Sequence, residues 1–375
     1  MLLFILGTRP ELIKIGPIIL ELRKRQVSRY LVINTGQHKE LLDRYWKIFD
    51  IRPDYNLDLI LPGQDLSTLT YRAIDKLNTL MYEVKLKYGA PSFIISQGDT
   101  TTVLAASIVA FYHSINFAHI EAGLRSFDLA QPFPEEYNRK VASLSAKWHF
   151  APTEIAKSNL IRENIDSGQI VVVGNTAIDA INIIMKSNEI KNLVFNDVRL
   201  NSFVNEKGKI VIITCHRREN QNQNLKSIIS AVESIARNRK DLKFVWPVHA
   251  NPNVKDIVLD SSLSTMENVF LTEALEYAEI IKLLINSFKV LTDSGGLQEE
   301  APSFKVPVLV LREKTERPEA VLAGYSRLVG ANKDTIIDCF YNFNPVFSDD
   351  FTNPYGDGDA SIKIIDRLLL NNVIN

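Results

Sequence analysis

Short apolar runs alternate along the chain with longer segments whose apolar residues follow helical spacing. The runs are nearly continuous in apolar residues, which is typical of parallel strands that are covered on both faces. The segments between them, such as 10–24 and 224–238, place apolar residues every three or four positions, as amphipathic helices do. This alternation predicts an α/β fold with doubly wound parallel sheets. The predicted strands are residues 2–6, 30–34, 93–96, 117–120, 171–173, 209–214, 243–247, 269–271, 289–292 and 307–311.

Chain length and one weakly patterned stretch predict two domains. The 375 residues suit two domains, and residues 186–208 show the weakest apolar periodicity. We expect an N-terminal Rossmann-like domain over residues 1–174, completed by residues from about 358 to 375, and a C-terminal Rossmann-like domain over 175–357. The terminal segment has helical spacing and is expected to pack back on the first domain. Two such domains facing each other would form a cleft at the carboxyl ends of both sheets.

Charge and composition narrow the classes of protein. The chain has 43 Lys and Arg against 44 Asp and Glu, a net charge of −1, so no global charge favours nucleic acid or an anionic membrane. Residues 100–120 lack charged side chains, but the polar residues among them make a membrane span costly. Two distant cysteines and six scattered histidines form no disulfide framework and no metal motif. We therefore expect a cytoplasmic enzyme without a metal.

Three carboxylates of the first half stand where strands end. Asp99 and Glu121 follow predicted strands, and Glu135 stands after two prolines in the next loop. Each alone is equally typical of a helix cap or of a charge near a helix start. Together they predict a cluster in which neighbouring carboxylates separate one another's pKa values, so that both an acid and a base are available near neutral pH.

The second half offers groups suited to a phosphate. His216 and Arg217 follow one predicted strand, and residues 294–296 are Ser-Gly-Gly after another. Bare main-chain N–H groups at such a turn bind phosphate, although a glycine-hinged helix start has the same pattern. Glu300 is placed to accept from a ribose diol, and Arg317 adds a cation. The chain contains neither Gly-x-Gly-x-x-Gly nor a P-loop, which disfavours a nicotinamide cofactor and P-loop hydrolysis.

Taken in chain order, these motifs resemble the non-hydrolysing UDP-N-acetylglucosamine 2-epimerases from residue 4 to about 369. The matching motifs are Gly7-Thr-Arg-Pro-Glu, Gly-Gln-His38, Gln-Gly-Asp99-Thr-Thr, His-Ile-Glu121-Ala-Gly-Leu-Arg, Phe-Pro-Glu135-Glu-Tyr-Asn-Arg, Val-Gly-Asn-Thr176, His216-Arg-Arg-Glu-Asn, Pro-Val-His249-Ala-Asn-Pro, Asp-Ser294-Gly-Gly-Leu-Gln-Glu-Glu-Ala-Pro, Thr-Glu-Arg317-Pro-Glu and Asn-Pro-Tyr-Gly-Asp-Gly358.

The resemblance implies a two-domain GT-B-like fold, a cytoplasmic homodimer, no cofactor, and a place in surface polysaccharide synthesis. The implied reaction is reversible epimerisation at C2 of UDP-N-acetylglucosamine through elimination of UDP and re-addition. Three sets of residues match family motifs. The catalytic set is Asp99, Glu121, Glu135 and His216. The set that contacts UDP is Arg9, Lys14, Ser294, Gly295, Gly296, Glu300 and Arg317. The set that holds a second UDP-N-acetylglucosamine as an allosteric activator is Gln37, Arg72, Glu136, Arg217 and His249.

Three positions depart from the family pattern, and several activities stay open. Glu40 stands where some relatives carry Gln, Gln97 where His is common, and Ile280 where an aromatic residue often faces the uracil. The alternatives are a GT-B glycosyltransferase, a hydrolysing epimerase, a non-catalytic sensor of nucleotide sugars, and an epimerase of a related UDP-2-acetamido sugar.

Overall fold

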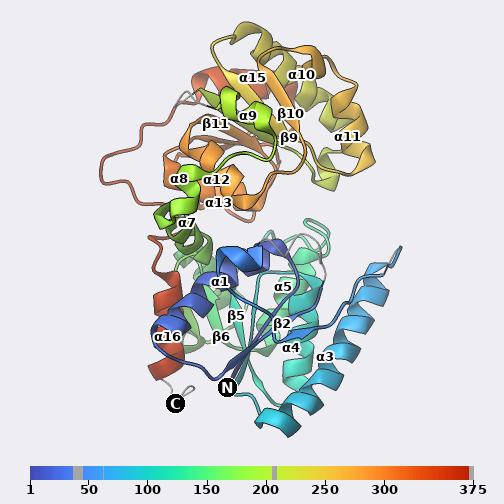
Figure 1. Ribbon diagram of the computed structural model, residues 1–375, viewed down its shortest axis with the longest axis vertical. Coiled ribbons are helices and arrows are strands. Elements are labelled where there is room, and N and C mark those ends of the chain that lie inside the picture. The colour runs from blue at the N-terminus through green and yellow to red at the C-terminus, as the bar shows by residue number, and fades with distance from the viewer. Residues whose placement is uncertain (37–44, 62, 205–208, 371–375) are drawn as a thin grey trace. The chain divides into compact units, whose positions relative to one another are not determined.

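The chain forms two parallel β-sheets, each within its own compact unit (Figure 1). The computed structural model describes residues 1–36, 45–61, 63–204 and 209–370. Unit 1 consists of Met1–Ile183 together with Tyr355–Asn375, and unit 2 consists of Ile184–Pro354. These units are defined by their compactness, so the domain boundaries expected near residues 174 and 358 stay predictions.

The sheet of unit 1 has seven strands in the order β3-β2-β1-β4-β5-β6-β7. All neighbouring strands are parallel. Its strands are β1 (Leu2–Leu6), β2 (Tyr30–Asn34), β3 (Tyr55–Asn56), β4 (Phe93–Gln97), β5 (Asn116–Ile120), β6 (Ala146–Ala151) and β7 (Ile170–Val172). The order 3-2-1-4-5-6 is that of a Rossmann sheet. The predicted fold class is therefore confirmed for this unit.

Helices cover both faces of this sheet, which explains its nearly continuous apolar strands. Leu3 and Ile5 of β1 pack into a core with residues of α3 and α4. Leu2, Phe4 and Leu6 alternate with them, so they point to the opposite face, and they are also fully buried. The helices of unit 1 are α1 (Arg9–Lys24), α3 (Leu66–Tyr88), α4 (Thr101–Tyr112), α5 (Glu135–Ser145), α6 (Glu154–Arg162), the start of α7 (Thr176–Lys186) and α16 (Ala360–Leu370).

The C-terminal helix α16 returns to unit 1 and packs against α1 (Figure 1). Its inward face is apolar, with Ile364, Ile365 and Leu368 fully buried. An ion pair of 2.5 Å between Arg25 and Asp366 lies beside this contact. The predicted return of the terminal helix is confirmed.

Unit 2 repeats the same topology with six strands in the order β10-β9-β8-β11-β12-β13, all parallel. Its strands are β8 (Ile210–Thr214), β9 (Lys243–Pro247), β10 (Val269–Thr272), β11 (Ser287–Thr292), β12 (Val308–Val310) and β13 (Ser326–Leu328). Its helices are α8 (Asn188–Asn192), α9 (Val198–Phe203), α10 (Gln223–Asn238), α11 (Pro252–Leu259), α12 (Tyr277–Ile285), α13 (Gly295–Glu300), α14 (Glu319–Leu322) and α15 (Lys333–Asn342). Its core includes Trp246 and Phe244 of β9, packed with the apolar face of α10.

Three strands, β3, β6 and β13, were not predicted. β6 begins directly after the last residue of α5, without a Gly or Pro to mark the boundary. β3 has only two residues, and β13 is the short Ser-Arg-Leu run at a sheet edge. Such strands form because they pair with a neighbouring strand. The local pattern of apolar residues does not indicate this pairing.

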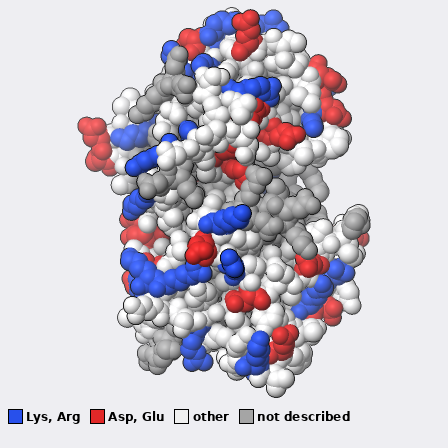
Figure 2. Space-filling model, in the orientation of Figure 1, with Lys and Arg blue, Asp and Glu red and all other residues white. Residues whose placement is uncertain are grey.

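Charges of both signs are interspersed on the face shown in Figure 2. This matches the nearly balanced composition of the chain. Within the described residues, no helix combines the length and apolar composition that a bilayer crossing requires.

Candidate active site

The predicted carboxylates of unit 1 converge on the carboxyl edge of its sheet. β4 and β5 are paired through their last residues, Gln97 and Ile120, so Asp99 and Glu121 follow at the same edge. Glu135 is the first residue of α5. One turn later the side-chain amide of Asn138 donates to the carbonyl oxygen of Asp99 at 2.8 Å, which fixes the start of α5 against the β4 loop.

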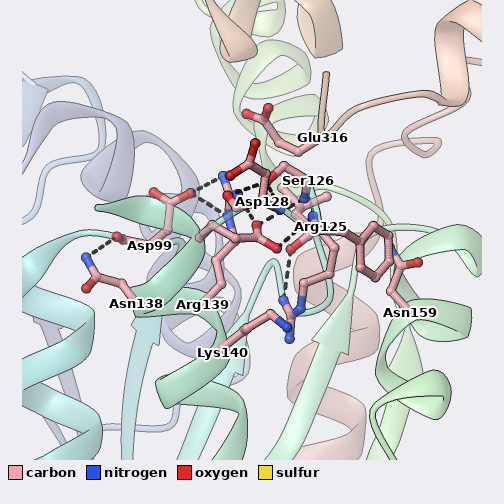
Figure 3. A network of polar contacts seen from close by, with 12 residues as sticks. Asp99, Arg125, Ser126, Asp128, Asn138, Arg139, Lys140, Asn159 and Glu316 are labelled. Carbon is pink, nitrogen blue, oxygen red and sulfur yellow. Dashed lines mark hydrogen bonds and ion pairs between the residues drawn. The ribbon is translucent and has the colours of Figure 1, made fainter. Parts of the chain in front are cut away.

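Asp99 is held by a buried arginine (Figure 3). Nε and Nη2 of Arg139 donate to Oδ2 of Asp99 at 2.9 and 2.6 Å. Nη1 of the same side chain donates to Oε2 of Glu136 at 3.0 Å. Two charge-assisted hydrogen bonds to one oxygen favour the ionised form of Asp99, which is the form a base requires.

Glu136, predicted to contact an activator, has a structural task in this arrangement. Its side chain is fully buried. Its two oxygens accept from the main-chain N–H groups of Ser126 and Phe127, each at 3.1 Å. Glu136 therefore holds the loop that follows β5, and through Arg139 it is linked to Asp99.

Glu121 has an unusual backbone and a buried ion pair. Its φ of 64° lies in the left-handed region, which costs a non-glycine residue about 1 kcal/mol or more and recurs at functional sites. Its carboxylate contacts Nζ of Lys14 and accepts from the amide of Asn175 at 3.3 Å. Lys14, predicted to contact UDP, thus pairs with a predicted catalytic carboxylate in the same unit.

Gly123 makes this turn possible. Its φ is 91°, and an added Cβ would lie 2.2 Å from the carbonyl oxygen of Ala156 in α6. No side chain fits that space without a shift of backbone. The Glu-Ala-Gly sequence therefore combines a residue with a strained backbone, Glu121, with a position that only glycine can occupy, Gly123.

The turn after β1 is fixed by Glu11, a residue that was not among the predicted site residues. Its carboxylate accepts from the N–H groups of Gly7 and Thr8 and from the hydroxyls of Thr8 and Thr100, all within 2.9 Å. Burial raises the pKa of Glu11 in spite of these hydrogen bonds. The Thr-x-x-Glu capping box was a readable signal for this residue. Arg9, a predicted UDP contact, lies 5.6 Å above the ring of Tyr45.

In unit 2, the ends of β8 and β11 bring His216 to Asp293. Nδ1 of His216 lies 3.2 Å from Oδ1 of Asp293, whose side chain is fully buried. The ring of His216 stacks on that of His249, with centroids 5.6 Å apart and planes 13° apart. The structure therefore places the predicted catalytic histidine beside a predicted activator contact.

The predicted UDP contacts of unit 2 form one group around the start of α13. An added Cβ on Gly295 would lie 2.6 Å from the guanidinium carbon of Arg317, so glycine lets this side chain lie close to the helix start. Nε of Arg317 donates to Glu299 at 2.6 Å. Glu300 accepts from the hydroxyl of Tyr277 at 3.1 Å. Gly296 is uncrowded at the same turn, because the atom nearest to an added Cβ, Oε1 of Glu300, would be 3.7 Å away.

The predicted activator contacts are divided between the two units. Arg72 lies in α3, where its Nε donates to the carbonyl oxygen of Leu59 at 3.1 Å. Arg217 and His249 belong to unit 2. Gln37 and Glu40 lie outside the described residues, as does His38. A shared activator site stays a prediction.

Among the described residues, no three His, Cys, Asp or Glu side chains gather as metal ligands would.

Comparison with known proteins gives one consistent result. The family model of UDP-N-acetylglucosamine 2-epimerase matches residues 20–369. A UDP-N-acetylglucosamine 2-epimerase of Neisseria meningitidis serogroup A is 42% identical over 374 residues, which cover 98% of this chain and 99% of the relative. The UDP-N-acetylglucosamine 2-epimerase of Escherichia coli K12 is 40% identical to this chain over 383 residues, which cover 99% of both chains.

Solved structures agree with the sequence matches. The N. meningitidis UDP-GlcNAc 2-epimerase bound to UDP-GlcNAc has a TM-score of 0.90 at 42% identity and covers 99% of this chain and 100% of its own. The Methanocaldococcus jannaschii enzyme in complex with UDP-GlcNAc and UDP has a TM-score of 0.84 at 34% identity, with 98% and 99% covered. The two Rossmann-like units and the order of the motifs agree with these matches, which cover nearly the whole chain. The chain therefore belongs to the UDP-N-acetylglucosamine 2-epimerase family of isomerases, whose structures have a GT-B-like fold.

Proposed function

We propose that this chain interconverts UDP-N-acetylglucosamine and UDP-N-acetylmannosamine by inverting the configuration at C2. Membership of the family supports the proposal. The observation that carries it is the geometry of Glu121, a buried carboxylate on a left-handed backbone, paired with Lys14, at the sheet edge where Asp99 is also held. A strained acidic residue at the same sheet edge as an arginine-bound carboxylate is an arrangement suited to proton transfer.

The chemistry begins with loss of the leaving group. The hydrogen on C2 of an N-acetylhexosamine is not acidic, so direct abstraction would be very slow. Cleavage of the C1–O bond sends its electron pair to the β-phosphate of UDP and acidifies the C2–H bond. A carboxylate takes the C2 proton, and the C–H electron pair forms the C1=C2 bond of a 2-acetamidoglucal. Attack of UDP on C1, with protonation of C2 on the other face, completes the inversion.

Two faces of C2 require two acid–base groups. We assign the base to Asp99 or Glu121 and the acid on the opposite face to Glu135. The assignment rests on the positions of the three carboxylates at the carboxyl edge of the sheet. Arg139 on Asp99 and Lys14 on Glu121 favour carboxylates that are charged before the proton is taken.

The leaving diphosphate needs donors, and unit 2 supplies them. We assign main-chain N–H groups of Ser294, Gly295 and Gly296, the guanidinium of Arg317 and the imidazole of His216 to UDP, with Arg9 and Lys14 from unit 1. Donors placed at developing negative charge stabilise the transition state of the cleavage. The assignment requires the two units to face each other across a cleft, which the strand–helix pattern of the sequence predicts.

One experiment tests the reaction. The chain is incubated with UDP-N-acetylglucosamine alone in heavy water, and NMR follows the sugar signals. We expect an equilibrium mixture of the two UDP-sugars with deuterium at C2. An unchanged substrate, free N-acetylmannosamine, or epimer that retains hydrogen at C2 would each contradict the proposal, and free sugar would indicate a hydrolysing enzyme.

A second molecule of UDP-N-acetylglucosamine is proposed as an activator, held by Arg72, Glu136, Arg217, His249 and Gln37. The contact of His216 with His249 supports a link between the two sites. Pure UDP-N-acetylmannosamine should then react only after a lag, and a trace of UDP-N-acetylglucosamine should remove the lag. Immediate linear conversion would rule out activation.

We also propose that the protein is a homodimer that uses an exposed aromatic surface of unit 1. This α3–α4 patch consists of Tyr82, Leu86, Phe111 and Tyr112, all between 65% and 91% exposed. His113, whose ring packs on Tyr82 at 5.1 Å, joins the two helices there. Apolar surfaces of this kind are typical of permanent interfaces. Leu86→Glu with Phe111→Glu should convert a dimer to a monomer in light scattering; the exposed Leu322→Glu in unit 2 is the control.

The cytoplasm is the proposed compartment. Cys215 and Cys339 are both free and buried, as in proteins of reducing compartments. Fractionation of cells that make the chain should place it with soluble cytoplasmic markers, and its recovery in a membrane or secreted fraction would contradict this.

A further inference from the structure

We propose that Asp293 is a positioning residue that holds a proton on Nδ1 of His216 and leaves Nε2 as the nitrogen that exchanges a proton with the leaving phosphate. The inference deepens the proposed function and rests on it, because His216 transfers a proton only if the chain binds a UDP-sugar. Asp293 itself contacts neither the sugar nor the phosphate in this scheme.

Strand order places the two residues together. β8 and β11 are neighbours, with Thr214 opposite Thr292, and the hydroxyls of these two residues are 2.5 Å apart. The N–H of Asp293 donates to the carbonyl oxygen of Thr214 at 3.2 Å. The residues that follow both strands therefore meet at the carboxyl edge of the sheet, in fixed register.

The two oxygens of Asp293 have different partners. Oδ2 accepts from the N–H groups of His216 and Arg217 at 2.9 and 2.8 Å, and from the amide of Asn220 at 3.0 Å. Oδ1 faces Nδ1 of His216. Oδ1 is buried and has no hydrogen-bond partner other than this neighbour among the described residues. Because an ionised carboxylate can only accept hydrogen bonds, a hydrogen bond between the two side chains requires the proton on Nδ1. A neutral His216 then has its free electron pair on Nε2, and a protonated one presents Nε2–H.

Charge and stacking keep this arrangement in place. Burial opposes ionisation of Asp293, but the hydrogen bonds from His216, Arg217 and Asn220 outweigh it and lower the pKa of Asp293 to about 2. The carboxylate is therefore charged throughout the neutral range. The parallel ring of His249 limits rotation of the His216 ring, and Nδ1 of His249 accepts from the N–H of Asn251 at 3.1 Å.

A purely structural role for Asp293 would look different in one respect. If the carboxylate only held the 215–217 loop, Asp293→Asn would keep most of that function, because one oxygen can still accept from the two main-chain N–H groups. The amide nitrogen would then face Nδ1 of His216 and donate to it. The loop would survive, but the proton of a neutral His216 would move to Nε2.

The test is a measurement of the tautomer. The full chain is labelled with [15N]histidine, His216→Gln identifies the signal, and long-range 1H–15N correlations report which nitrogen carries the proton at a pH where the ring is neutral. We expect Nδ1–H in the unmodified chain and Nε2–H in Asp293→Asn. Nε2–H in the unmodified chain, or an unchanged tautomer in the variant, would overturn the inference.

A matched control separates positioning from general damage. Asp179 is also buried and accepts from the N–H and hydroxyl of Ser361 at 2.8 and 2.6 Å, far from any of these rings in sequence and in a different unit. Asp179→Asn should leave the His216 tautomer unchanged. If Asp293→Asn does not fold, the tautomer of the unmodified chain still decides the question.

Kinetics give a second readout. We expect Asp293→Asn to lower kcat about tenfold to a hundredfold with little change in KM, and to shift the pH profile of kcat, since proton transfer at Nε2 is affected. In the His216→Gln background the same change should cost nothing further, because Asp293 acts through the ring. Independent, multiplicative losses would contradict the inference.

The outcomes distinguish this inference from the proposed function. An active enzyme whose unmodified His216 has Nε2–H disproves the positioning role alone. A chain with Nδ1–H but no epimerase activity disproves the proposed function, and the positioning of the ring by Asp293 stands as a structural fact.

Discussion

The two units use the same sheet order to support opposite charges. At the carboxyl edge of unit 1, cations hold carboxylates, as Arg139 holds Asp99 and Lys14 contacts Glu121. At the same edge of unit 2, carboxylates hold cations or rings, as Glu299 holds Arg317 and Asp293 contacts His216. Under the proposed function, the same topology therefore supports acid–base carboxylates in unit 1 and phosphate-binding groups in unit 2.

The largest expected effect comes from neutralising the carboxylates of unit 1. Glu121→Gln, Asp99→Asn and Glu135→Gln should each reduce turnover at least about a hundredfold, the usual scale for loss of an acid or base. A coupled assay for UDP-N-acetylmannosamine measures this. The control is Glu163→Gln, which loses an ion pair to Arg125 at 2.8 Å without touching the carboxylates. If all three variants keep near-parental rates, carboxylate catalysis is wrong.

Glycines at the two edges should respond differently to the same change. Gly123→Ala meets a carbonyl oxygen of the backbone at 2.2 Å on a positive φ, and we expect a loss of about 2–3 kcal/mol in unfolding free energy. Gly295→Ala meets the guanidinium of Arg317, a side-chain end that is paired with Glu299 but can shift more easily than a backbone carbonyl, so the loss should be smaller, about 1 kcal/mol. Denaturant titration of both variants tests this, and equal losses would show that the two turns are equally constrained.

Arginine-to-lysine changes test whether unit 1 supports proton transfer while unit 2 binds the UDP-sugar. Arg139→Lys keeps a charge but loses the paired hydrogen bonds to Asp99, so kcat should fall about tenfold with KM little changed. Arg317→Lys should instead raise KM for the UDP-sugar about tenfold. Steady-state kinetics measure both, and the reverse pattern would mean that the roles of the units are exchanged.

The smallest expected effect is a change in unfolding free energy with pH. It comes from a buried charged group for which the described residues provide no ionic partner. Lys289 is fully buried in unit 2 and donates to the carbonyl oxygens of Phe340 and Phe343, near the end of α15. Burial lowers the pKa of Lys289 to about 8. The unfolded chain binds this proton up to about pH 10.5, so unfolding free energy should rise by about 1 kcal/mol between pH 8 and 9.

Lys289→Met should remove this rise, which denaturant titration at the two pH values detects. An identical pH dependence in the Lys289→Met variant and the parent would show that Lys289 is not the source.

Glu11 in unit 1 has the opposite effect on the pH dependence of stability. Because burial raises the pKa of Glu11, its contribution to stability falls as the pH increases above about 4.5.

Sequence patterns predicted the positions of the candidate residues better than their partners. β1, β2 and β9 have the predicted bounds, and Asp99, Glu121, His216 and Ser294 stand at strand ends as expected. Their partners are brought close by the tertiary fold. Arg139 is 40 residues from Asp99, Asp293 is 77 from His216, and Glu121 is 107 from Lys14.

No local spacing connects residues so far apart. The left-handed backbone of Glu121 was equally hidden, because the surrounding structure imposes it on a residue type that normally avoids it. By contrast, the capping box of Glu11 was legible within four residues, since both of its members lie on one helix turn.

The most direct test asks whether the C1–O bond breaks during turnover. UDP-N-acetylglucosamine carrying 18O in the bridge between C1 and the β-phosphate is incubated with the chain, and 31P NMR follows the isotope. We predict that 18O moves into the non-bridging positions of the β-phosphate, because the freed diphosphate can rotate before it attacks C1 again. Epimer in which all 18O remains in the bridge would contradict the account.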